Sequence, residues 1–195
     1  DIATTLEDIV AFRIRALTAY QNETCARSYK DFVVKVQKAE AERAKGLSGL
    51  ADAVARYYFK LLAYKDEYEV ARLYTSGAFT QRLNDQFEGN FKLKFHMVPP
   101  LFAKYDLETG QQLKKEFGPW MMLALGLLAR LRFLRGSAVD VFGYSRERKL
   151  ERQLIANYET TIDELLGKLN HNNHELAVAI ATIPEHIRGF GHIKD

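Results

Sequence analysis

The stretch TTLEDIVAFRIRALTAY, residues 4–20, decides the class of fold. Its apolar residues recur three and four positions apart, which places them on one face of an α-helix. Thr4-x-x-Glu7 has the form of a capping box, in which two side chains satisfy amide donors at a helix start. The apolar stripe continues to Val36 without proline or glycine, and Gly46 follows a charged run. The pattern therefore predicts one long N-terminal helix or a helix pair.

The rest of the chain is also mostly helical in pattern. Ser145 and Asn172 are the residues expected to cap the last two helices. Apolar stripes with helical spacing follow at residues 50–62, 68–73, 79–87, 150–169 and 172–181. We find no internal repeat and no linker-like stretch, so residues 1–195 are expected to form a single, mainly α-helical domain.

Residues 91–117 and 120–129 depart from the amphipathic helical pattern. Alternation of apolar and polar residues over 91–96 is typical of a half-buried strand. Residues 101–105 and 113–117 flank a turn-forming loop, which predicts a small β-hairpin insertion. Trp120–Ala129 is apolar on all sides and follows a Gly-Pro pair, so we expect it to be a central buried helix.

Composition limits the chemistry of this chain. The 195 residues carry a net charge of +3 and one cysteine, Cys25, which we interpret as a packed thiol. A disulfide within the chain is impossible, and an iron–sulfur cluster normally needs four thiolates, so the chain cannot hold a cluster alone. Its longest nearly apolar stretch, residues 117–129, is shorter than the roughly 20 residues of a membrane-spanning helix. We expect a cytoplasmic segment of a longer polypeptide.

Basic residues gather between positions 130 and 152. Seven basic against three acidic residues give this stretch a charge of +4, so the remainder carries −1. The candidates for partner docking are Arg130, Arg132, Arg135, Arg146, Arg148, Lys149 and Arg152. Such a surface suits an acidic protein or a phosphorylated ligand, whereas solvated helices with local ion pairs are the alternative. Aromatic residues suited to stacking on bases are sparse there, so nucleic acid is not expected.

The histidines and glycines near the C-terminus offer a second candidate site. Arg188, Gly189, Gly191 and His192 could bind an anion, whereas a C-terminal docking arm that turns at its glycines is the alternative and the simpler interpretation. His171 and His174 lie three apart, but no third ligand at suitable spacing accompanies them, so no metal site is expected. An enzyme that uses His96, Arg188 and His192 on a phosphorylated substrate is the remaining catalytic alternative.

Several long segments are informative through their exact residues and not only through their pattern of apolar and polar positions. They are Leu17–Asn22, Lys60–Thr75, Leu93–His96 with Pro99-Pro100, Phe117–Trp120, Arg132–Gly136 and Ile187–Lys194. Together they resemble the C-terminal domain of unknown function in large fused indolepyruvate ferredoxin oxidoreductases. The resemblance implies a parent enzyme that oxidatively decarboxylates 2-oxoacids to acyl-coenzyme A with thiamine diphosphate and iron–sulfur clusters and passes electrons to ferredoxin. Those cofactors would belong to other domains, and no catalytic residue is carried over to this chain.

The resemblance implies an accessory role for this segment, which alone would be non-catalytic. It would pack on the catalytic domains of the same polypeptide, and its basic stretch would help to dock ferredoxin or coenzyme A. The alternative is a free-standing helical module that binds a protein partner without catalysing a reaction.

Overall fold

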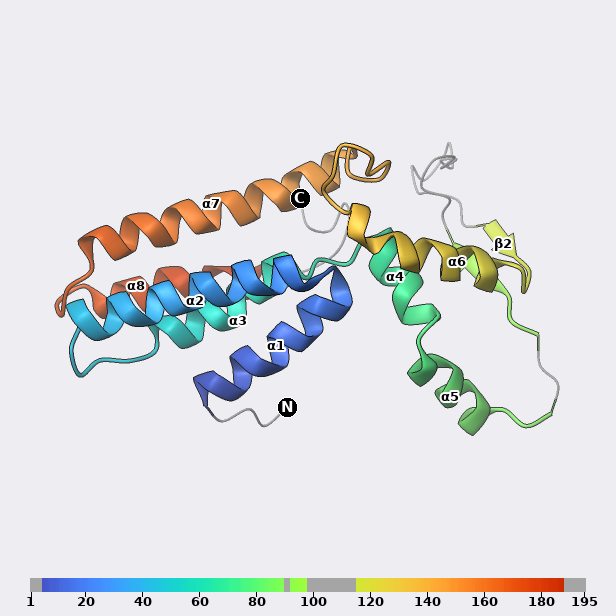
Figure 1. Ribbon diagram of the computed structural model, residues 1–195, viewed down its shortest axis with the longest axis horizontal. Coiled ribbons are helices and arrows are strands. Elements are labelled where there is room, and N and C mark those ends of the chain that lie inside the picture. The colour runs from blue at the N-terminus through green and yellow to red at the C-terminus, as the bar shows by residue number, and fades with distance from the viewer. Residues whose placement is uncertain (1–4, 90–91, 98–114, 188–195) are drawn as a thin grey trace. The chain divides into compact units, whose positions relative to one another are not determined.

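The computed structural model describes residues 5–89, 92–97 and 115–187 (Figure 1). The chain is mainly helical with a small antiparallel hairpin, as predicted. Its internal contacts divide it into two compact units. Unit 1 combines residues 1–65 with residues 143–195, and unit 2 is the continuous segment 66–142. The single domain expected from the sequence stays a prediction.

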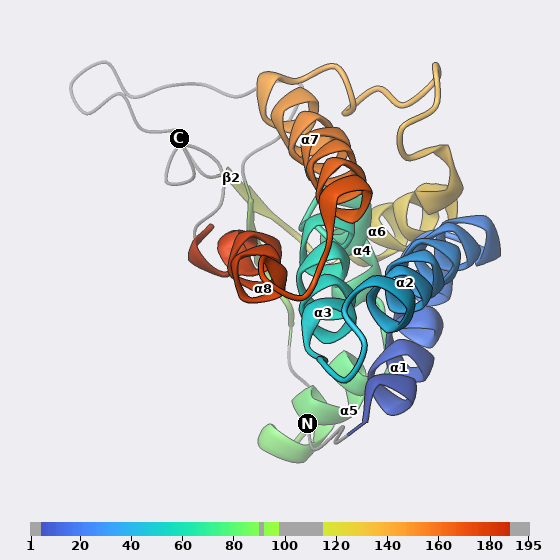
Figure 2. The ribbon, with the colours of Figure 1, turned by 90° about the vertical axis from the view of Figure 1, so that its left-hand side faces the viewer.

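Unit 1 is a helical bundle organised around one helix. It contains α1 (Leu6–Tyr20), α2 (Glu23–Arg43), α3 (Leu50–Leu62), α7 (Arg146–Lys168), α8 (His174–Thr182) and the 3₁₀ helix η2 (Ile183–His186). Helix α3 contacts α1, α2, α7 and α8, and Figure 2 shows it among them. Its buried face includes Ala51 and Ala55, whose small side chains let the neighbouring helices approach closely.

The N-terminal helices form the predicted pair. Asn22 separates them and caps α2, because its side-chain oxygen accepts a hydrogen bond from the Cys25 amide at 2.9 Å. The capping box predicted at Thr4 is displaced by one residue. The N-cap of α1 is Thr5, whose hydroxyl accepts from the Asp8 amide at 3.2 Å, while Thr4 lies outside the described residues.

Three tyrosines form the aromatic centre of unit 1. The Tyr58 ring stacks on those of Tyr29 and Tyr158, with centroid separations of 6.0 and 6.1 Å. The hydroxyls of Tyr29 and Tyr158 donate to the carbonyls of Ala55 and Ala181, respectively, each at 2.9 Å. The Tyr58 hydroxyl donates to the carboxylate of Glu159. Burial, the largest cause in each case, raises the pKa of all three phenols well above the usual value of 10.0.

The stability of the chain is expected to fall steeply above pH 10. Unfolded tyrosines ionise near that pH, whereas Tyr29, Tyr58 and Tyr158 stay protonated in the fold, so the folded state binds more protons. Each phenol then contributes a slope of up to about −1.4 kcal/mol per pH unit. Urea unfolding between pH 8 and 11 measures this slope, and Tyr158→Phe should reduce it by no more than about a quarter, because burial also raises the pKa of Tyr68 in unit 2. An unchanged slope in that variant would contradict the assignment.

Unit 2 packs short helices against a two-stranded hairpin. It contains α4 (Glu67–Tyr74), α5 (Gly77–Gln86), β1 (Phe95–Met97), β2 (Lys115–Phe117), α6 (Met121–Arg130) and the 3₁₀ helix η1 (Leu131–Leu134). The strands are antiparallel, with Phe95 opposite Phe117. Strand β2 falls within the predicted second strand, and its partner is β1, whereas residues 101–105 lie outside the described residues.

The prediction of a central buried helix over Trp120–Ala129 was wrong. In α6 only Leu125 and Ala129 are buried, in a small cluster with Ala71 of α4 and Phe95 of β1. An apolar composition predicts burial on every side, but α4 and the hairpin cover one face only. In unit 1 the central helix is α3, which contacts α1, α2, α7 and α8.

Candidate interaction surface

One face of α6 is apolar and open to solvent. Trp120, Leu123 and Leu127 are spaced three and four residues apart and therefore lie on the same side of the helix. Their exposed fractions are 59%, 81% and 62%. Scattered exposed leucines are ordinary on a protein surface, but a stripe of this length on one helix indicates an interaction site. We call these three residues the α6 face.

The local sequence explains how the α6 face is presented. Gly118-Pro119 precedes the helix, and the Met121 amide donates to the Gly118 carbonyl at 3.1 Å in the opening turn. The Trp120 ring meets the Phe117 ring edge-to-face at a centroid distance of 5.9 Å, so β2 helps to orient the indole.

The charge around the α6 face is basic. Residues 117–139 contain no aspartate or glutamate and three arginines, of which Arg135 is buried, whereas Arg130 and Arg132 are accessible. Arg130 lies seven residues after Leu123, on the same side of the helix, and is exposed. Arg132 is half-buried, and in the described part of the chain its Nε has no hydrogen-bond partner. The face therefore complements an apolar surface that is bordered by carboxylates.

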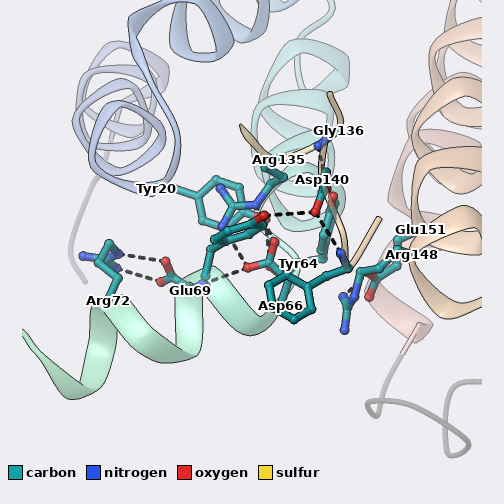
Figure 3. Close-up of polar contacts among 12 residues, drawn as sticks. Tyr20, Tyr64, Asp66, Glu69, Arg72, Arg135, Gly136, Asp140, Arg148 and Glu151 are labelled. Carbon is teal, nitrogen blue, oxygen red and sulfur yellow. Dashed lines mark hydrogen bonds and ion pairs between the residues drawn. The ribbon is translucent and has the colours of Figure 1, made fainter. Parts of the chain in front are cut away.

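A buried ion pair joins the residues after α6 to the start of α4 (Figure 3). Asp66 caps α4 by accepting from the Glu69 amide at 2.8 Å. The Arg135 guanidinium donates to both carboxylate oxygens of Asp66, at 2.5 and 2.8 Å, and both side chains are 3% exposed. The same guanidinium lies 5.6 Å from the Tyr68 ring centroid. Arg135, predicted as a docking residue, is therefore a buried structural residue.

Asp140 completes the buried polar cluster of unit 2 (Figure 3). Its carboxylate accepts from the Gly136 amide at 2.8 Å, the Phe142 amide at 3.2 Å and the Tyr68 hydroxyl at 3.1 Å. Gly136 has a φ of +75°, a conformation that favours glycine at this turn. Burial and then the nearby Asp140 charge raise the pKa of Tyr68, so its phenol remains a donor.

The other predicted docking residues lie in different environments. Arg148 is buried in unit 1, where it pairs with Glu151 and lies 5.5 Å from the Tyr64 ring centroid (Figure 3). Arg146 and Lys149 are exposed, and half-buried Arg152 donates to the Gly143 carbonyl at 2.5 Å. Arg148 is thus a structural residue like Arg135, and docking by the remaining five residues stays a prediction.

The predicted histidine pair separates into a buried and an exposed residue. His174 Nε2 lies 2.7 Å from Glu40 Oε1, and both side chains are buried. The Glu40 carboxylate also accepts from the amides of Leu50 and Ala51, at 2.8 and 3.0 Å, and so caps α3. His171 is exposed. Among the residues that the structure describes, no group of three or more His, Cys, Asp or Glu side chains is placed to hold a metal ion.

The remaining candidates are placed as follows. Ser145 caps α7 as predicted, by accepting from the Arg148 amide at 3.3 Å. Helix α8 begins after Asn173 rather than Asn172, and the Asn173 side chain accepts from the Asn170 amide instead of capping the helix. Exposed His96 lies on β1, with its Nε2 3.8 Å from a carboxylate oxygen of Glu116. Residues Arg188, Gly189, Gly191 and His192 lie outside the described residues.

Two further properties concern the apolar helices and the cysteine of the chain. Within the described ranges, no helix combines the length and apolar character needed to cross a membrane. Cys25 is a half-buried thiol on α2 and is the single cysteine of the sequence, so the chain lacks the four thiolates of an iron–sulfur cluster.

The fold and the α6 face define a mainly helical protein with an uncovered apolar surface on its smaller unit. Residues 6–195 match the model of a family of unknown function, DUF6537, and the chain belongs to that family. Neither the curated proteins nor the solved structures include a significant match.

Proposed function

We propose that this chain is an accessory, non-catalytic domain that packs on a protein partner through the α6 face. The observation that carries the proposal is the exposure of Leu123, 81%, between two other exposed apolar residues of one helix. Covering such a face stabilises a complex by roughly 25 cal/mol for each Å² of apolar surface removed from water. The basic residues beside it favour a partner surface bordered by carboxylates.

The partner in this proposal is the catalytic part of a cytoplasmic 2-oxoacid:ferredoxin oxidoreductase, within the same polypeptide. The support is the resemblance to the C-terminal domain of fused indolepyruvate ferredoxin oxidoreductases. Two of the resembling segments, Phe117–Trp120 and Arg132–Gly136, flank α6, and a third, Lys60–Thr75, contains the helix that packs on its other side. Thiamine diphosphate and the iron–sulfur clusters would be held by the catalytic part.

The exposed basic residues have a secondary role in the same proposal. Arg130, Arg146 and Lys149 are accessible, and they would help to dock acidic ferredoxin or the phosphates of coenzyme A. Such long-range attraction affects the rate of association more than the affinity, and salt weakens it.

Substituting the α6 face is expected to weaken packing on the catalytic part. Leu127→Glu places a carboxylate in a contact that would otherwise be apolar, so the dissociation constant should rise at least tenfold, equivalent to about 1.4 kcal/mol. The measurement is isothermal titration of the chain with separately produced catalytic part of a fused indolepyruvate ferredoxin oxidoreductase. The matched control is Leu176→Glu on α8, because Leu176 and Leu127 are both 62% exposed.

The outcomes separate the accessory role from its alternatives. Binding that Leu127→Glu weakens and Leu176→Glu leaves unchanged supports the proposal. Absence of binding, or equal weakening by both substitutions, contradicts it. Self-association that Leu127→Glu removes, measured by analytical ultracentrifugation, would assign the α6 face to a second copy of the chain instead.

A further inference from the structure

Unit 1 contains an arginine whose charge has no counterion in the described chain. Arg13 projects from the middle of α1, which contacts α3. The hydroxyl of Tyr20 donates to the Tyr64 carbonyl at 2.8 Å and holds the end of α1 near the residues that follow α3. The Arg13 guanidinium carbon lies 4.4 Å from the centroid of the Phe59 ring on α3. Because Nε of the stacked guanidinium is enclosed, its two terminal Nη atoms are the donors left for another group.

The polar atoms of Arg13 are incompletely satisfied. The side chain is half-buried, and its Nε is enclosed without a hydrogen-bond partner in the described residues. A guanidinium removed from water usually recovers the lost hydration by donating to a carboxylate, a phosphate or backbone carbonyls. Within the described ranges, Arg13 forms no such ion pair.

A second arginine adds to the positive charge. Arg56 is exposed and lies three residues before Phe59, on the same side of α3 as the ring on which Arg13 stacks. Burial, and to a smaller extent the Arg56 charge, lower the pKa of Arg13, while Tyr29 opposes them. Tyr29 is no counterion, because its phenol is neutral and donates to the Ala55 carbonyl. In the described part of the chain neither guanidinium forms an ion pair with a carboxylate, and two neighbouring cations of this kind favour an added anion.

We propose that Arg13 and Arg56 form a binding site for a phosphate group between α1 and α3. Two positive charges match a phosphate, which carries a charge of about −1.5 to −2 near pH 7. The planar guanidinium of Arg13 can donate two parallel hydrogen bonds to two phosphate oxygens, and Arg56 supplies the second charge from the solvent side. The site lies in unit 1, so it is independent of the α6 face and of the function proposed above.

Inorganic phosphate is the probe that tests the site. Titration calorimetry of the whole chain should show saturable binding, and acetate at equal ionic strength should bind at least tenfold more weakly. Arg13→Gln and Arg56→Gln should each weaken phosphate binding at least tenfold. Arg15→Gln is the matched control, because Arg15 is an exposed arginine on the same helix and its loss changes the net charge equally.

Each result decides the proposal. Unchanged binding in Arg15→Gln together with weakened binding in the other two variants supports the site. Absence of saturable binding by the wild-type chain overturns it, and so does equal weakening in all three variants, which would reflect net charge alone. Equal binding of acetate and phosphate also overturns it. If Arg13→Gln alters the circular dichroism spectrum, Arg56→Gln still decides, because that side chain is exposed.

Discussion

Replacing Asp66 by alanine is expected to lower the free energy of unfolding by about 3–5 kcal/mol, the usual cost of breaking a buried ion pair. The substitution removes the cap of α4 and the carboxylate that accepts two hydrogen bonds from the buried Arg135 guanidinium. Urea unfolding followed by circular dichroism measures the loss. Hydrogen exchange of peptides that cover α4 should show that protection falls in unit 2.

Glu69→Ala is the control for this substitution. Glu69 lies on the same helix and makes a two-point ion pair with Arg72, whose side chain is 32% exposed. Because that pair is accessible to water, its loss should cost about 1 kcal/mol or less. A double substitution, Asp66→Ala with Arg135→Met, should recover part of the stability that Asp66→Ala loses, since the guanidinium that lost its Asp66 partner is then removed as well. Equal losses in Asp66→Ala and Glu69→Ala would contradict the structural role of the pair.

Glu40→Ala is expected to have the largest effect on unit 1, about 3 kcal/mol or more. Its carboxylate accepts from the Leu50 and Ala51 amides and lies against His174, so the substitution leaves three buried polar groups without their acceptor. Since α3 contacts the surrounding helices of unit 1, fraying at its first turn should loosen the whole bundle.

Thermal unfolding and hydrogen exchange test the role of Glu40. Amides near the start of α3 should lose protection from exchange in Glu40→Ala but retain it in Glu42→Ala. The second substitution is the control, because it removes an exposed carboxylate from α2, the helix that also carries Glu40. A smaller loss in Glu40→Ala than in Glu42→Ala would show that Glu40 does not hold α3.

Local patterns in the sequence predicted the helices well, because periodicity, caps and breaks are local. The N-terminal helix pair, the Ser145 cap and the existence of α6 all follow from such signals. The sequence did not show which neighbouring element covers each apolar helix face. An apolar helix is compatible with burial on every side or with one uncovered face, and only the neighbouring elements distinguish these cases for α6.

The buried charges were missed for a related reason. Asp66 and Glu40 lie in charged stretches that resemble solvated helix surfaces, while their partners Arg135 and His174 lie 69 and 134 residues further along the chain. One signal was available: Glu40 follows Val36 by four residues and so lies on the apolar stripe of α2.

The arrangement of the two units along the chain also has a consequence for how the protein folds. Unit 1 is discontinuous in sequence. Helix α3 packs on α7 and α8, although residues 66–142 separate it from them along the chain. Within unit 2, the Tyr68 and Phe142 rings lie 5.4 Å apart, and its two ends are therefore neighbours. Once unit 2 has folded, it acts as a short connection rather than a long flexible loop. The entropic cost of joining the two halves of unit 1 falls accordingly, which favours a route in which unit 2 forms first.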